Sequence, residues 1–481
     1  MRLSKLFKNA PTINITGLSF DSRKVLQGNI YFCLPGLTFD GHDFIADAIK
    51  NGAVCIVHSK KLMNMAPGAV YIRVDDVNDA MNQVARIFYA KPSDKMTMYG
   101  VTGTNGKSTI TNIIRNILNH EKPCGYIGTI SIEYGDVKLQ PNLTTPDALF
   151  LQDKLQDMVR CGMKACALEV SSHGLAQHRV DGISFDCAIF TNLTYDHLDF
   201  HGTMENYLEA KCLLFKNLVK ENGVSILNKD DEKYNYLKDI SRARVISYAI
   251  NSEADYRAIH IKMTSSSTEF DLVYSGELYP LKTNLVGNFN IYNLLAAIAA
   301  LHQTGMNLKT ILSYCVHLPQ VDGRMEKIEC GQNFNVIVDF AHTPDGMEKM
   351  MQFGKDITIQ GHRLISVFGS AGKRDTHKRK VFGQIADKYC DYVILTEDDP
   401  RDEDPKQIAD QIKSGIENTS YVFIEDRYEA IRQALTCAQE GDTVLILGKG
   451  DEPYMYRENG RAPWIGDNVA CKECIERDVL N

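Results

Sequence analysis

The 481-residue sequence lacks the features of several protein classes. No apolar run approaches the roughly 18 residues that a membrane-spanning helix needs. The apolar part of Met1 to Phe7 is too short for a secretory signal peptide. The formal net charge of −8 gives no general attraction to nucleic acid or to anionic membranes. We therefore expect a cytoplasmic monomer with no nucleic-acid partner and no membrane insertion.

The cysteines lack the pattern of a disulfide framework. There are 13, an odd number, scattered along the chain, as is typical of reduced thiols in the cytosol. Cys471 and Cys474 have the spacing of a zinc or redox pair, but no second pair accompanies them. We interpret these two as neighbours on one face of a helix. The composition is ordinary, 44% hydrophobic and 24% charged, and the length predicts about two to four domains.

The chain does contain a candidate phosphate-binding loop. The apolar run Met96 to Val101 indicates a buried strand, and the turn Gly103-Thr104-Asn105-Gly106 follows it. Lys107-Ser108-Thr109 comes next, and apolar residues then recur at helical spacing from Ile110 to Leu118. The glycines let backbone N–H groups face an anion, and the helix N-terminus adds partial positive charge. Lys107 can reach terminal phosphates, and the Ser108 hydroxyl can bind Mg²⁺. The alternative is a glycine turn with a surface lysine.

The loop departs from the general P-loop pattern. Two residues, rather than four, separate Gly103 from Gly106-Lys107. This shorter form resembles the loop of the Mur ligase and folylpolyglutamate synthetase superfamily.

Polar residues follow two further predicted strands. Lys164 to Val170 carries Glu169 near its end, where a second Mg²⁺ ligand belongs beside a phosphate loop. Cys187 to Phe190 leads into a segment that contains His197 and His201. Because ligands of open α/β sheets bind at the carboxyl ends of strands, we expect a site there. Each histidine taken alone could equally be an ordinary loop residue.

From about residue 327 onward, strands and helices alternate again. Four predicted strands each release a polar or glycine-rich loop at the carboxyl end: Val336 to Asp339, Arg363 to Phe368, Tyr392 to Leu395 and Thr443 to Leu447. This pattern predicts a doubly wound parallel sheet whose ligands bind at those loops.

Short motifs are spread along nearly the whole chain. In chain order they are Phe20 to Arg23, Gly36 to Gly41, the phosphate loop, Leu143 to Pro146, Glu169 to Leu175, Tyr195 to Gly202, Tyr207 to Lys211, Gly287 to Asn293, Asp339 to Asp345 and Asp398 to Arg401. Together they resemble the Mur ligase family, and within it the enzymes that add the third stem-peptide residue of bacterial peptidoglycan. The resemblance implies an α/β fold in three domains. These would be an N-terminal UDP-MurNAc-binding domain (1–95), a central P-loop ATPase domain (96–323) and a C-terminal Rossmann-like, amino-acid-binding domain (324–481).

The resemblance also implies a reaction. ATP would phosphorylate the γ-carboxylate of D-Glu in UDP-MurNAc-L-Ala-D-Glu, and an amine of a diamino acid would then attack the acyl phosphate. Phosphate transfer between anions needs neutralised charge and aligned atoms, which Mg²⁺ and Lys107 would provide.

Roles for individual residues are implied in the same way. ATP would be bound by Gly103, Thr104, Asn105, Gly106, Lys107, Ser108, Thr109, Asn290, Arg324, Asp339 and His342. Catalysis would involve Lys107, Glu169, His197 and Lys211. The metal ligands would be Ser108, Glu169, His197 and Lys211, the last as a carbamate formed by the deprotonated amine. The UDP-MurNAc-dipeptide would be held by Phe20, Ser22, Thr38, Thr144, Thr145, Ser171, Gln177 and Arg179. The amino acid would be bound by Arg379, Asp398, Asp399, Pro400, Arg401, Gly448 and Glu452.

The incoming amino acid depends on small differences in charge. Family members that use meso-diaminopimelate usually carry Asp-Asn-Pro-Arg where this chain has Asp398-Asp399-Pro400-Arg401. Arg401 keeps the fork suited to a distal carboxylate. Asp399, and Asp451 in place of a more usual histidine, add negative charge to the expected pocket. This slightly favours L-lysine over meso-diaminopimelate, and Asp399→Asn should shift the preference toward diaminopimelate.

Three other readings compete with this one. A folylpolyglutamate synthetase-like ligase shares the loop and the acyl-phosphate route, but Asp21-Ser22-Arg23 and the loop ending in Arg401 argue against it. The ligase that adds D-Ala-D-Ala is a second alternative. A nucleotide-switched binding module without ligation would keep Lys107 but would not need Lys211.

Overall fold

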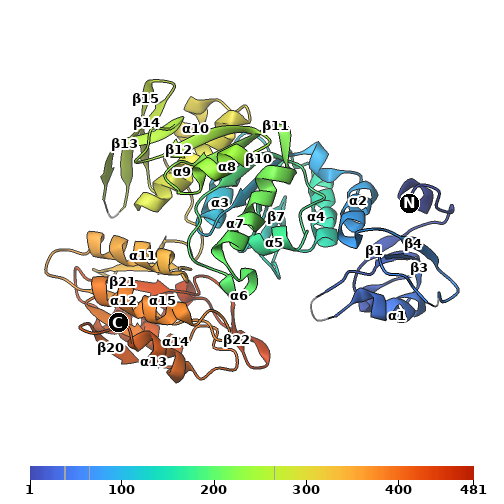
Figure 1. Cartoon of the computed structure of the whole chain (residues 1–481). Helices are drawn as coiled ribbons and strands as arrows, with labels where there is room; N and C mark the ends of the chain where they lie inside the picture. The colour runs from blue at the N-terminus through green and yellow to red at the C-terminus, as the bar shows by residue number, and fades with distance from the viewer. Residues whose placement is uncertain (37–38, 64, 265, 481) are drawn as a thin grey trace.

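The computed structural model describes residues 1–36, 39–63, 65–264 and 266–480. In chain order it contains a four-stranded, an eleven-stranded and a six-stranded sheet, followed by a two-stranded hairpin. Figure 1 shows these as three bodies, with the N-terminal part in blue, the central part in cyan to yellow and the C-terminal part in orange to red. The predicted three-part α/β architecture is thus confirmed. The boundaries at 95 and 323 stay predictions.

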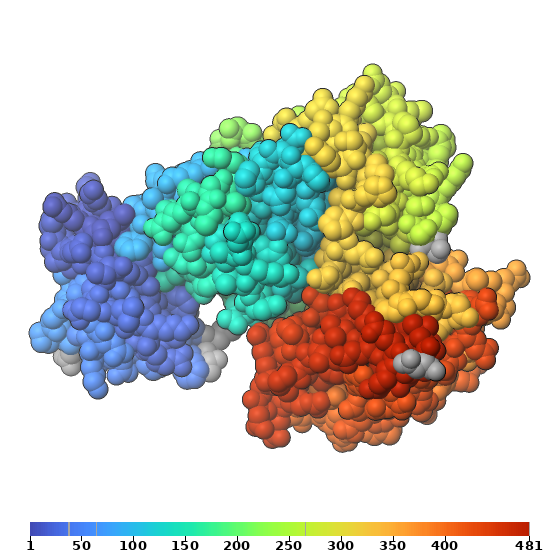
Figure 2. Space-filling view, turned by 180° about the vertical axis from the view of Figure 1, so that it is seen from behind, coloured from blue at the N-terminus to red at the C-terminus, as the bar shows by residue number. Residues whose placement is uncertain are grey.

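The N-terminal sheet is small and wholly parallel. Its strands, in sheet order, are β1 (Gly17–Ser19), β2 (Asn29–Phe32), β3 (Ala53–His58) and β4 (Val70–Arg73). Helix α1 (Ile45–Lys50) precedes β3, and α2 (Val77–Phe88) follows β4. The buried face of α2 shares one apolar cluster with Ala148 and Leu149 of the central part. The N-terminal part is therefore fixed to the central part. In the view of Figure 2, open space separates it from the C-terminal part.

Strand β5 (Thr97–Thr102), which leads into the phosphate loop, lies inside the central sheet. The sheet order is β15-β14-β13-β12-β11-β10-β5-β9-β6-β7-β8. The other strands are β6 (Cys124–Ile127), β7 (Ile132–Tyr134), β8 (Val137–Leu139), β9 (Ala165–Glu169), β10 (Phe185–Phe190), β11 (Val219–Asn228), β12 (Arg244–Ala249), β13 (Tyr256–Met263), β14 (Thr268–Tyr274) and β15 (Glu277–Thr283). β9 and β10 flank β5 in parallel. The loops that follow these three strands therefore open at one edge of the sheet.

Helices cover both faces of the central sheet (Figure 1). One face packs α3 (Lys107–Asn119), α9 (Asn288–Gln303) and α10 (Leu308–Tyr314). The other packs α4 (Ala148–Arg160), α7 (Met204–Leu213) and α8 (Tyr234–Ile240). The short helices α5 (Ser172–Ala176) and α6 (Leu198–His201) lie within the loops after β9 and β10. In α3 the predicted apolar positions, including Ile110, Ile114 and Ile117, are all buried.

The C-terminal sheet has the predicted doubly wound form. Its strands, in sheet order, are β16 (Glu326–Lys327), β17 (Asn335–Asp339), β21 (Thr443–Leu447), β18 (Leu364–Phe368), β19 (Tyr392–Leu395) and β20 (Ser420–Phe423). All pairs except β16–β17 are parallel. Helices α11 (Pro344–Ile357), α12 (His377–Tyr389) and α13 (Pro405–Lys413) pack on one face. Helices α14 (Arg427–Cys437) and α15 (Asp467–Cys474) pack on the other, and β22 (Tyr454–Arg457) and β23 (Gly460–Pro463) form the hairpin.

The remaining sequence expectations have simple outcomes. Cys471 and Cys474 are both buried in α15, and all 13 cysteines are free thiols. Over the described ranges, no helix is both long and apolar enough to cross a membrane.

Candidate functional site

The phosphate loop has a backbone that only glycine can adopt at two positions. Gly103 has a φ of 147° and Gly106 a φ of 90°. A Cβ at Gly103 would lie 1.8 Å from the hydroxyl oxygen of Thr191, and one at Gly106 would lie 2.5 Å from Oδ1 of Asn293. Gly106 is the N-cap of α3, and Lys107 is its first residue. The strand, loop and helix predicted from sequence are therefore present in that order.

Lys107 folds back over its own loop. Its Nζ donates to the carbonyl oxygens of Gly103 at 3.0 Å and of Thr104 at 2.8 Å. Burial lowers the pKa of Lys107, although the carboxylates of Glu169 and Asp196 act in the opposite direction. Because both partners of Nζ are carbonyl oxygens and neither is a carboxylate, phosphate oxygens can replace them.

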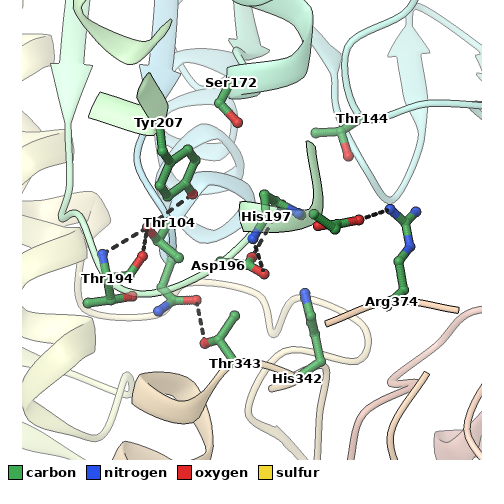
Figure 3. A network of polar contacts seen from close by, with 12 residues as sticks. Thr104, Thr144, Ser172, Thr194, Asp196, His197, Tyr207, His342, Thr343 and Arg374 are labelled. Carbon is green, nitrogen blue, oxygen red and sulfur yellow. Dashed lines mark hydrogen bonds and ion pairs between the residues drawn. The ribbon is translucent and has the colours of Figure 1, made fainter. Parts of the chain in front are cut away.

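A cavity of about 990 Å³ lies between the central and C-terminal parts. Its walls include residues that were predicted to bind ATP, the metal ion, the UDP-MurNAc-dipeptide and the amino acid. These are Thr104, Asn105, Gly106, Lys107, Ser108, Thr109, Thr144, Glu169, His197, Asn290, Arg324, Asp339, His342 and Glu452. Figure 3 shows His197, His342 and Arg374 approaching this space from different elements. The structure thus brings together the predicted ATP site, two of the predicted metal ligands besides Ser108, and one residue of each substrate site.

Glu169 is a buried carboxylate held by donors on three sides. The Tyr126 hydroxyl donates to its Oε1 at 2.7 Å, and Thr129 donates its N–H to Oε1 at 3.0 Å and its hydroxyl to Oε2 at 3.1 Å. The side chain is 0% exposed. Within the described part of the chain, no Lys, Arg or His nitrogen lies within ion-pair distance of it. A buried anion with hydrogen bonds but no cation is a candidate ligand for a metal ion.

Histidines line the space beside Glu169. The rings of His173 and His197 meet edge to face, 4.8 Å apart. Burial lowers the pKa of His197 to about 3 and that of His342 to about 4. Both imidazoles are therefore neutral at pH 7, which is the form that can accept a proton or bind a metal. Nε2 of His197 also lies 3.2 Å from Oδ2 of Asp196.

Lys211 does not line the cavity but lies buried beneath it in α7. Its side chain is 1% exposed, and its Nζ lies 4.3 Å from the centre of the Tyr207 ring. The described residues place no carboxylate within ion-pair distance of Nζ. Burial, helped by the charge of Lys107, lowers the pKa of Lys211 well below its ordinary value. The tyrosine hydroxyl in turn contacts the Thr104 hydroxyl at 3.2 Å, which links this lysine to the phosphate loop (Figure 3).

The other predicted ATP-binding residues lie on α9, on the linker to the C-terminal part and after β17. Asn290 donates its amide to the carbonyl oxygen of Val286 at 2.9 Å and accepts from the Asn293 amide at 3.0 Å. Neither side chain caps α9, whose N-cap is Gly287. The Arg324 guanidinium lies 4.2 Å from the centre of the Phe340 ring. Burial raises the pKa of Asp339, which accepts the N–H groups of Met325 and Ala341.

The predicted residues for the UDP-MurNAc-dipeptide lie in two places. Thr145 donates to the carbonyl oxygen of Glu169 at 2.8 Å and accepts the N–H of Ser171 at 2.9 Å. Arg179 donates to the carbonyl oxygen of Thr145 at 2.8 Å and to the Gln177 side chain. These residues form one connected edge beside Thr144. Phe20 and Ser22 lie in the N-terminal part and do not line the cavity, and Thr38 lies outside the described residues.

The predicted amino-acid loops follow β19 and β21. Asp399 accepts from Nζ of Lys449 at 2.9 Å and from the N–H of Tyr456 at 2.9 Å. Nζ of Lys449 also contacts Oε2 of Glu452, and the Lys449 side chain is almost fully buried. Burial raises the pKa of Glu452, and the positive charge of Lys449 partly offsets this rise.

These contacts change two premises of the argument for lysine. Asp399 is not a free extra anion, because it pairs with Lys449, a partner that it shares with Glu452. Asp451 does not face Asp399; its Oδ1 lies against Gly323, on the linker beside Arg324. The loop itself is tightly placed: Arg401 has a φ of 54°, and its guanidinium donates to the carbonyl oxygen of Gly372 at 2.6 Å. Pro400, by contrast, contributes backbone only, its carbonyl oxygen accepting the N–H of Glu403 at 3.0 Å.

Arg379 was predicted to bind the amino acid, but its neighbour Arg374 is the arginine that reaches the cavity. Arg379 is buried, and its guanidinium donates to Glu403, Gln411 and the carbonyl oxygen of Ala371. It therefore holds the 370–373 loop and does not line the cavity. Arg374, which sequence reasoning missed, does line it and pairs with Asp199 at 3.0 Å (Figure 3). Both arginines belong to one basic run, so only the fold decides which of them faces the cavity.

Comparison with known proteins identifies relatives of the whole chain. Residues 101–301 match the model of the Mur ligase middle domain, residues 323–450 that of the Mur ligase glutamate ligase domain, and residues 14–89 that of the Mur ligase family catalytic domain. The UDP-N-acetylmuramoyl-L-alanyl-D-glutamate--2,6-diaminopimelate ligase of Geobacillus kaustophilus is 42% identical over 454 residues, covering 93% of this chain and 92% of the relative. A ligase of the same name from Clostridium acetobutylicum is 42% identical over 447 residues, covering 92% and 91%. A solved structure with that name has a TM-score of 0.72 at 32% identity and covers 100% of both chains.

Proposed function

The chain belongs to the Mur ligase family, and we propose that it is an ATP-dependent ligase of peptidoglycan precursor synthesis. It would join a diamino acid to the D-Glu γ-carboxylate of UDP-MurNAc-L-Ala-D-Glu. The observation that carries this proposal is the single cavity shared by the phosphate loop, Thr144 and Glu452. Nucleotide, acceptor and amine can therefore meet in one place. A folylpolyglutamate synthase is among the similar solved structures, but at 14% identity it shows a shared fold alone. The relatives at 42% identity are named as diaminopimelate ligases, which supports neither that alternative nor the switch.

The proposed reaction has two steps. An oxygen of the γ-carboxylate attacks the γ-phosphorus of ATP, which gives an acyl phosphate and releases ADP. The free amine then attacks the acyl carbon, and the tetrahedral intermediate expels phosphate as the amide forms. Lys107 and the N-terminus of α3 would hold the phosphates. Glu452, whose raised pKa makes it a better proton acceptor than an exposed glutamate, would bind the ammonium form of the incoming amine and take its proton.

The residues expected to hold Mg²⁺ fit a hard cation. Glu169 is a buried carboxylate without a basic partner among the described side chains, and Ser108 lines the same cavity. His197 is a poorer match, since Mg²⁺ prefers oxygen ligands. When bound, Mg²⁺ would neutralise charge on the phosphates. The described residues contain no group of three or more His, Cys, Asp or Glu side chains with the geometry of a metal site. The proposed Mg²⁺ ligands besides Glu169 are therefore oxygen atoms of Ser108, of the phosphates and of Lys211 as a carbamate.

Lys211 is suited to become that carbamate. Its amine is buried without a counter-ion in the described structure, so the neutral form is favoured. A neutral amine can take up CO₂ and release a proton, and the product is an anionic oxygen ligand below the phosphate loop. We therefore keep ATP, Mg²⁺ and carbamylated Lys211 as the proposed cofactor set.

Between the two candidate amino acids, the observations favour 2,6-diaminopimelate. The relatives at 42% identity are named as ligases for it, and the ion pair of Asp399 with Lys449 weakens the main electrostatic reason to prefer L-lysine. Arg401 and the cavity-lining Arg374 offer two guanidinium groups, which suits a substrate with two carboxylates. L-Lysine remains the alternative substrate of the same reaction.

The remaining assignments are proposals of the same kind. We assign Phe20, Ser22 and the edge from Thr144 to Arg179 to the UDP-MurNAc-dipeptide, and we keep the domain ranges 1–95, 96–323 and 324–481. The free thiols support a cytoplasmic location.

Product mass tests the proposed function. The chain is incubated with ATP, Mg²⁺ and UDP-MurNAc-L-Ala-D-Glu, with equal concentrations of meso-diaminopimelate and L-lysine in competition. We expect ADP release that depends on both acceptors and a product mass that corresponds to diaminopimelate. A product mass that corresponds to lysine would refute diaminopimelate as the preferred substrate and support L-lysine instead. ADP release without any amide product would refute the ligase.

A further inference from the structure

A fully buried ion pair lies directly behind the two proposed amino-acid loops. Arg427 is the first residue of α14, and Asp467 is the first residue of α15. Both side chains are 0% exposed. The Arg427 Nε donates to Oδ1 of Asp467 and its Nη2 donates to Oδ2, each at 2.7 Å. Neither residue lines the cavity, and nothing in the proposed mechanism uses them.

The remaining donors of Arg427 bind the backbone at the ends of two strands. Its Nη1 donates to the carbonyl oxygen of Glu397 at 3.1 Å, and its Nη2 donates to that of Leu447 at 2.9 Å. Glu397 lies two residues beyond the end of β19 and directly precedes Asp398, and Leu447 ends β21 and directly precedes Gly448. Because the guanidinium is planar and rigid, it fixes the distance between the two strand ends.

Asp467 adds a third point of attachment. Its backbone N–H donates to the carbonyl oxygen of Gly450 at 2.8 Å. One ion pair therefore ties the 397–401 loop, the 448–452 loop and the start of α15 into a single unit. Without it, the two loops would be joined mainly through the exchangeable side-chain contacts of Asp399, Lys449 and Glu452.

The loops tolerate very little displacement where this unit holds them. A Cβ at Gly448 would lie 2.4 Å from Oδ2 of Asp398 and 3.8 Å from Nη2 of Arg427. Burial raises the pKa of Asp398, and the cations Arg427 and Lys449 oppose that effect. The same guanidinium thus sets both the position and the charge environment of the Asp398 carboxylate.

We propose that Arg427 and Asp467 are positioning residues for the incoming diamino acid, which act by fixing the spacing of the two loops that bind it. This inference rests on the proposed function of those loops. It predicts a larger effect on amino-acid binding than on ATP binding. The phosphate loop belongs to another sheet, and the ATP site meets the held unit only at Asp339, whose carbonyl oxygen accepts the N–H of Gly448 at 3.0 Å.

The chain offers a matched control for this proposal. Arg363 pairs with Asp442 through Nε at 3.1 Å and Nη2 at 2.7 Å, both to Oδ2, and its Nη2 also donates to the carbonyl oxygen of Cys437. Its side chain is 39% exposed, so it is the more accessible of the two pairs. This pair joins the starts of β18 and β21, at the opposite edge of the sheet from the loops. Replacing it disturbs the same sheet without touching the proposed site.

The experiment compares two double variants, Arg427→Met/Asp467→Leu and Arg363→Met/Asp442→Leu, with Arg427→Lys as a milder change. Each double variant removes both charges, so that no unpaired buried ion remains. We expect the first to raise the KM for the amino acid by about 30- to 100-fold, since small displacements of positioning groups have effects of this size. The KM for ATP should rise by at least about tenfold less than the KM for the amino acid, since Asp339 is the one ATP-site residue bonded to the held loops. Arg427→Lys keeps the charge but loses the fork, and should lie between wild type and the double variant. The control should lower the thermal midpoint without changing either KM.

Hydrogen exchange gives a second readout that needs no substrate. In Arg427→Lys, backbone amides of the 397–401 and 448–452 loops should exchange faster than in wild type, while those of the phosphate loop should not. An unchanged amino-acid KM in a folded Arg427 variant, or a parallel rise in both KM values, would overturn the inference. Absence of amide product from the wild-type chain would instead refute the proposed function.

Discussion

The phosphate loop and Glu452 of the amino-acid loops line one cavity, and the two regions handle charge in opposite ways. Among the described residues, Glu169 has no cation and Lys211 has no anion within ion-pair distance, although both are buried. The amino-acid loops are internally paired instead: Asp399 and Glu452 share Lys449, Arg379 pairs with Glu403, and Arg427 pairs with Asp467.

This difference indicates how the two walls would contribute to the reaction. The phosphate wall carries unbalanced charge that ATP, a metal ion and a carbamate would complete. The charges of the amino-acid wall are already paired within the protein, although two carboxylates share Lys449, so we expect its selectivity to depend mainly on geometry. Four changes test this contrast, from the largest expected effect to the smallest.

Replacing Lys107 should have the largest effect. Lys107→Met removes the only side-chain cation that the loop itself directs at the phosphates. We expect kcat to fall by about 10³-fold, as when a preorganised charge at a reacting oxyanion is removed. Steady-state ADP release measures this. The matched control is Lys122→Met, beyond the end of the same helix, which should stay within twofold of wild type. A Lys107→Met enzyme with near-normal kcat would contradict the assignment.

Glu169→Gln separates stability from activity. Its Oε1 can keep the donors Tyr126 and Thr129, and its amide can donate to the Thr129 hydroxyl. Because a buried anion without a cation is removed, the free energy of unfolding should stay the same or rise by about 1 kcal/mol. The kcat should nevertheless fall about 10²-fold, through loss of a metal ligand. Thermal melts and turnover at several Mg²⁺ concentrations measure both quantities. A large loss of stability would mean that the carboxylate is structural.

Asp399→Asn tests whether the paired charges of the amino-acid loops affect the choice of amino acid. Because Lys449 pairs with Asp399 and with Glu452, the substitution leaves that lysine with one carboxylate partner. The ratio of kcat/KM for diaminopimelate to that for lysine should then rise by less than about threefold. A rise of tenfold or more would restore the electrostatic argument for lysine that the loop sequence suggested.

Asp451→Asn should have the smallest effect on activity, and its effect on stability should depend on pH. Burial raises the pKa of Asp451 to about 6, from an ordinary value near 3.8. The ionised carboxylate therefore destabilises the folded state fully above pH 6, and this penalty disappears as the pH falls below 4. The variant should be more stable than wild type at pH 7, by at most about 3 kcal/mol, and equal to it near pH 4. Thermal midpoints across that range check the sign, and equal differences at both pH values would contradict it.

Much of the architecture could be predicted because periodicity is a local property of the chain. The strand before Gly103, the helix from Lys107 and the strands that end at Phe368, Leu395 and Leu447 all lie where the sequence placed them. Local pattern is less reliable for short or irregular segments. The apolar pair Ile13 and Ile15 is typical of a strand, but Asn14 forms only an isolated bridge with Arg2, so no ladder extends. Helix α7 ends as regular α-helix at Leu213, and a wider turn over Leu214–Leu218 follows it.

The side-chain pairing could not be predicted, since it depends on contacts between distant segments. Nothing in the spacing of Asp399 and Lys449, 50 residues apart, indicates that they form an ion pair. The same holds for the pair of Arg427 and Asp467. It also holds for Arg379, which pairs with Glu403, and for Arg374, which pairs with Asp199 beside the cavity. The motif list identified the segments of the site, and the fold decided which side chains face it.

The acyl-phosphate route is the central claim, and an oxygen-transfer measurement tests it most directly. UDP-MurNAc-L-Ala-D-Glu labelled with ¹⁸O in the D-Glu γ-carboxylate is converted with ATP, Mg²⁺ and diaminopimelate, and the released phosphate is analysed by mass. If the carboxylate attacks the γ-phosphorus, one labelled oxygen should appear in phosphate for each amide formed. Unlabelled phosphate, or label appearing in AMP, would contradict the account.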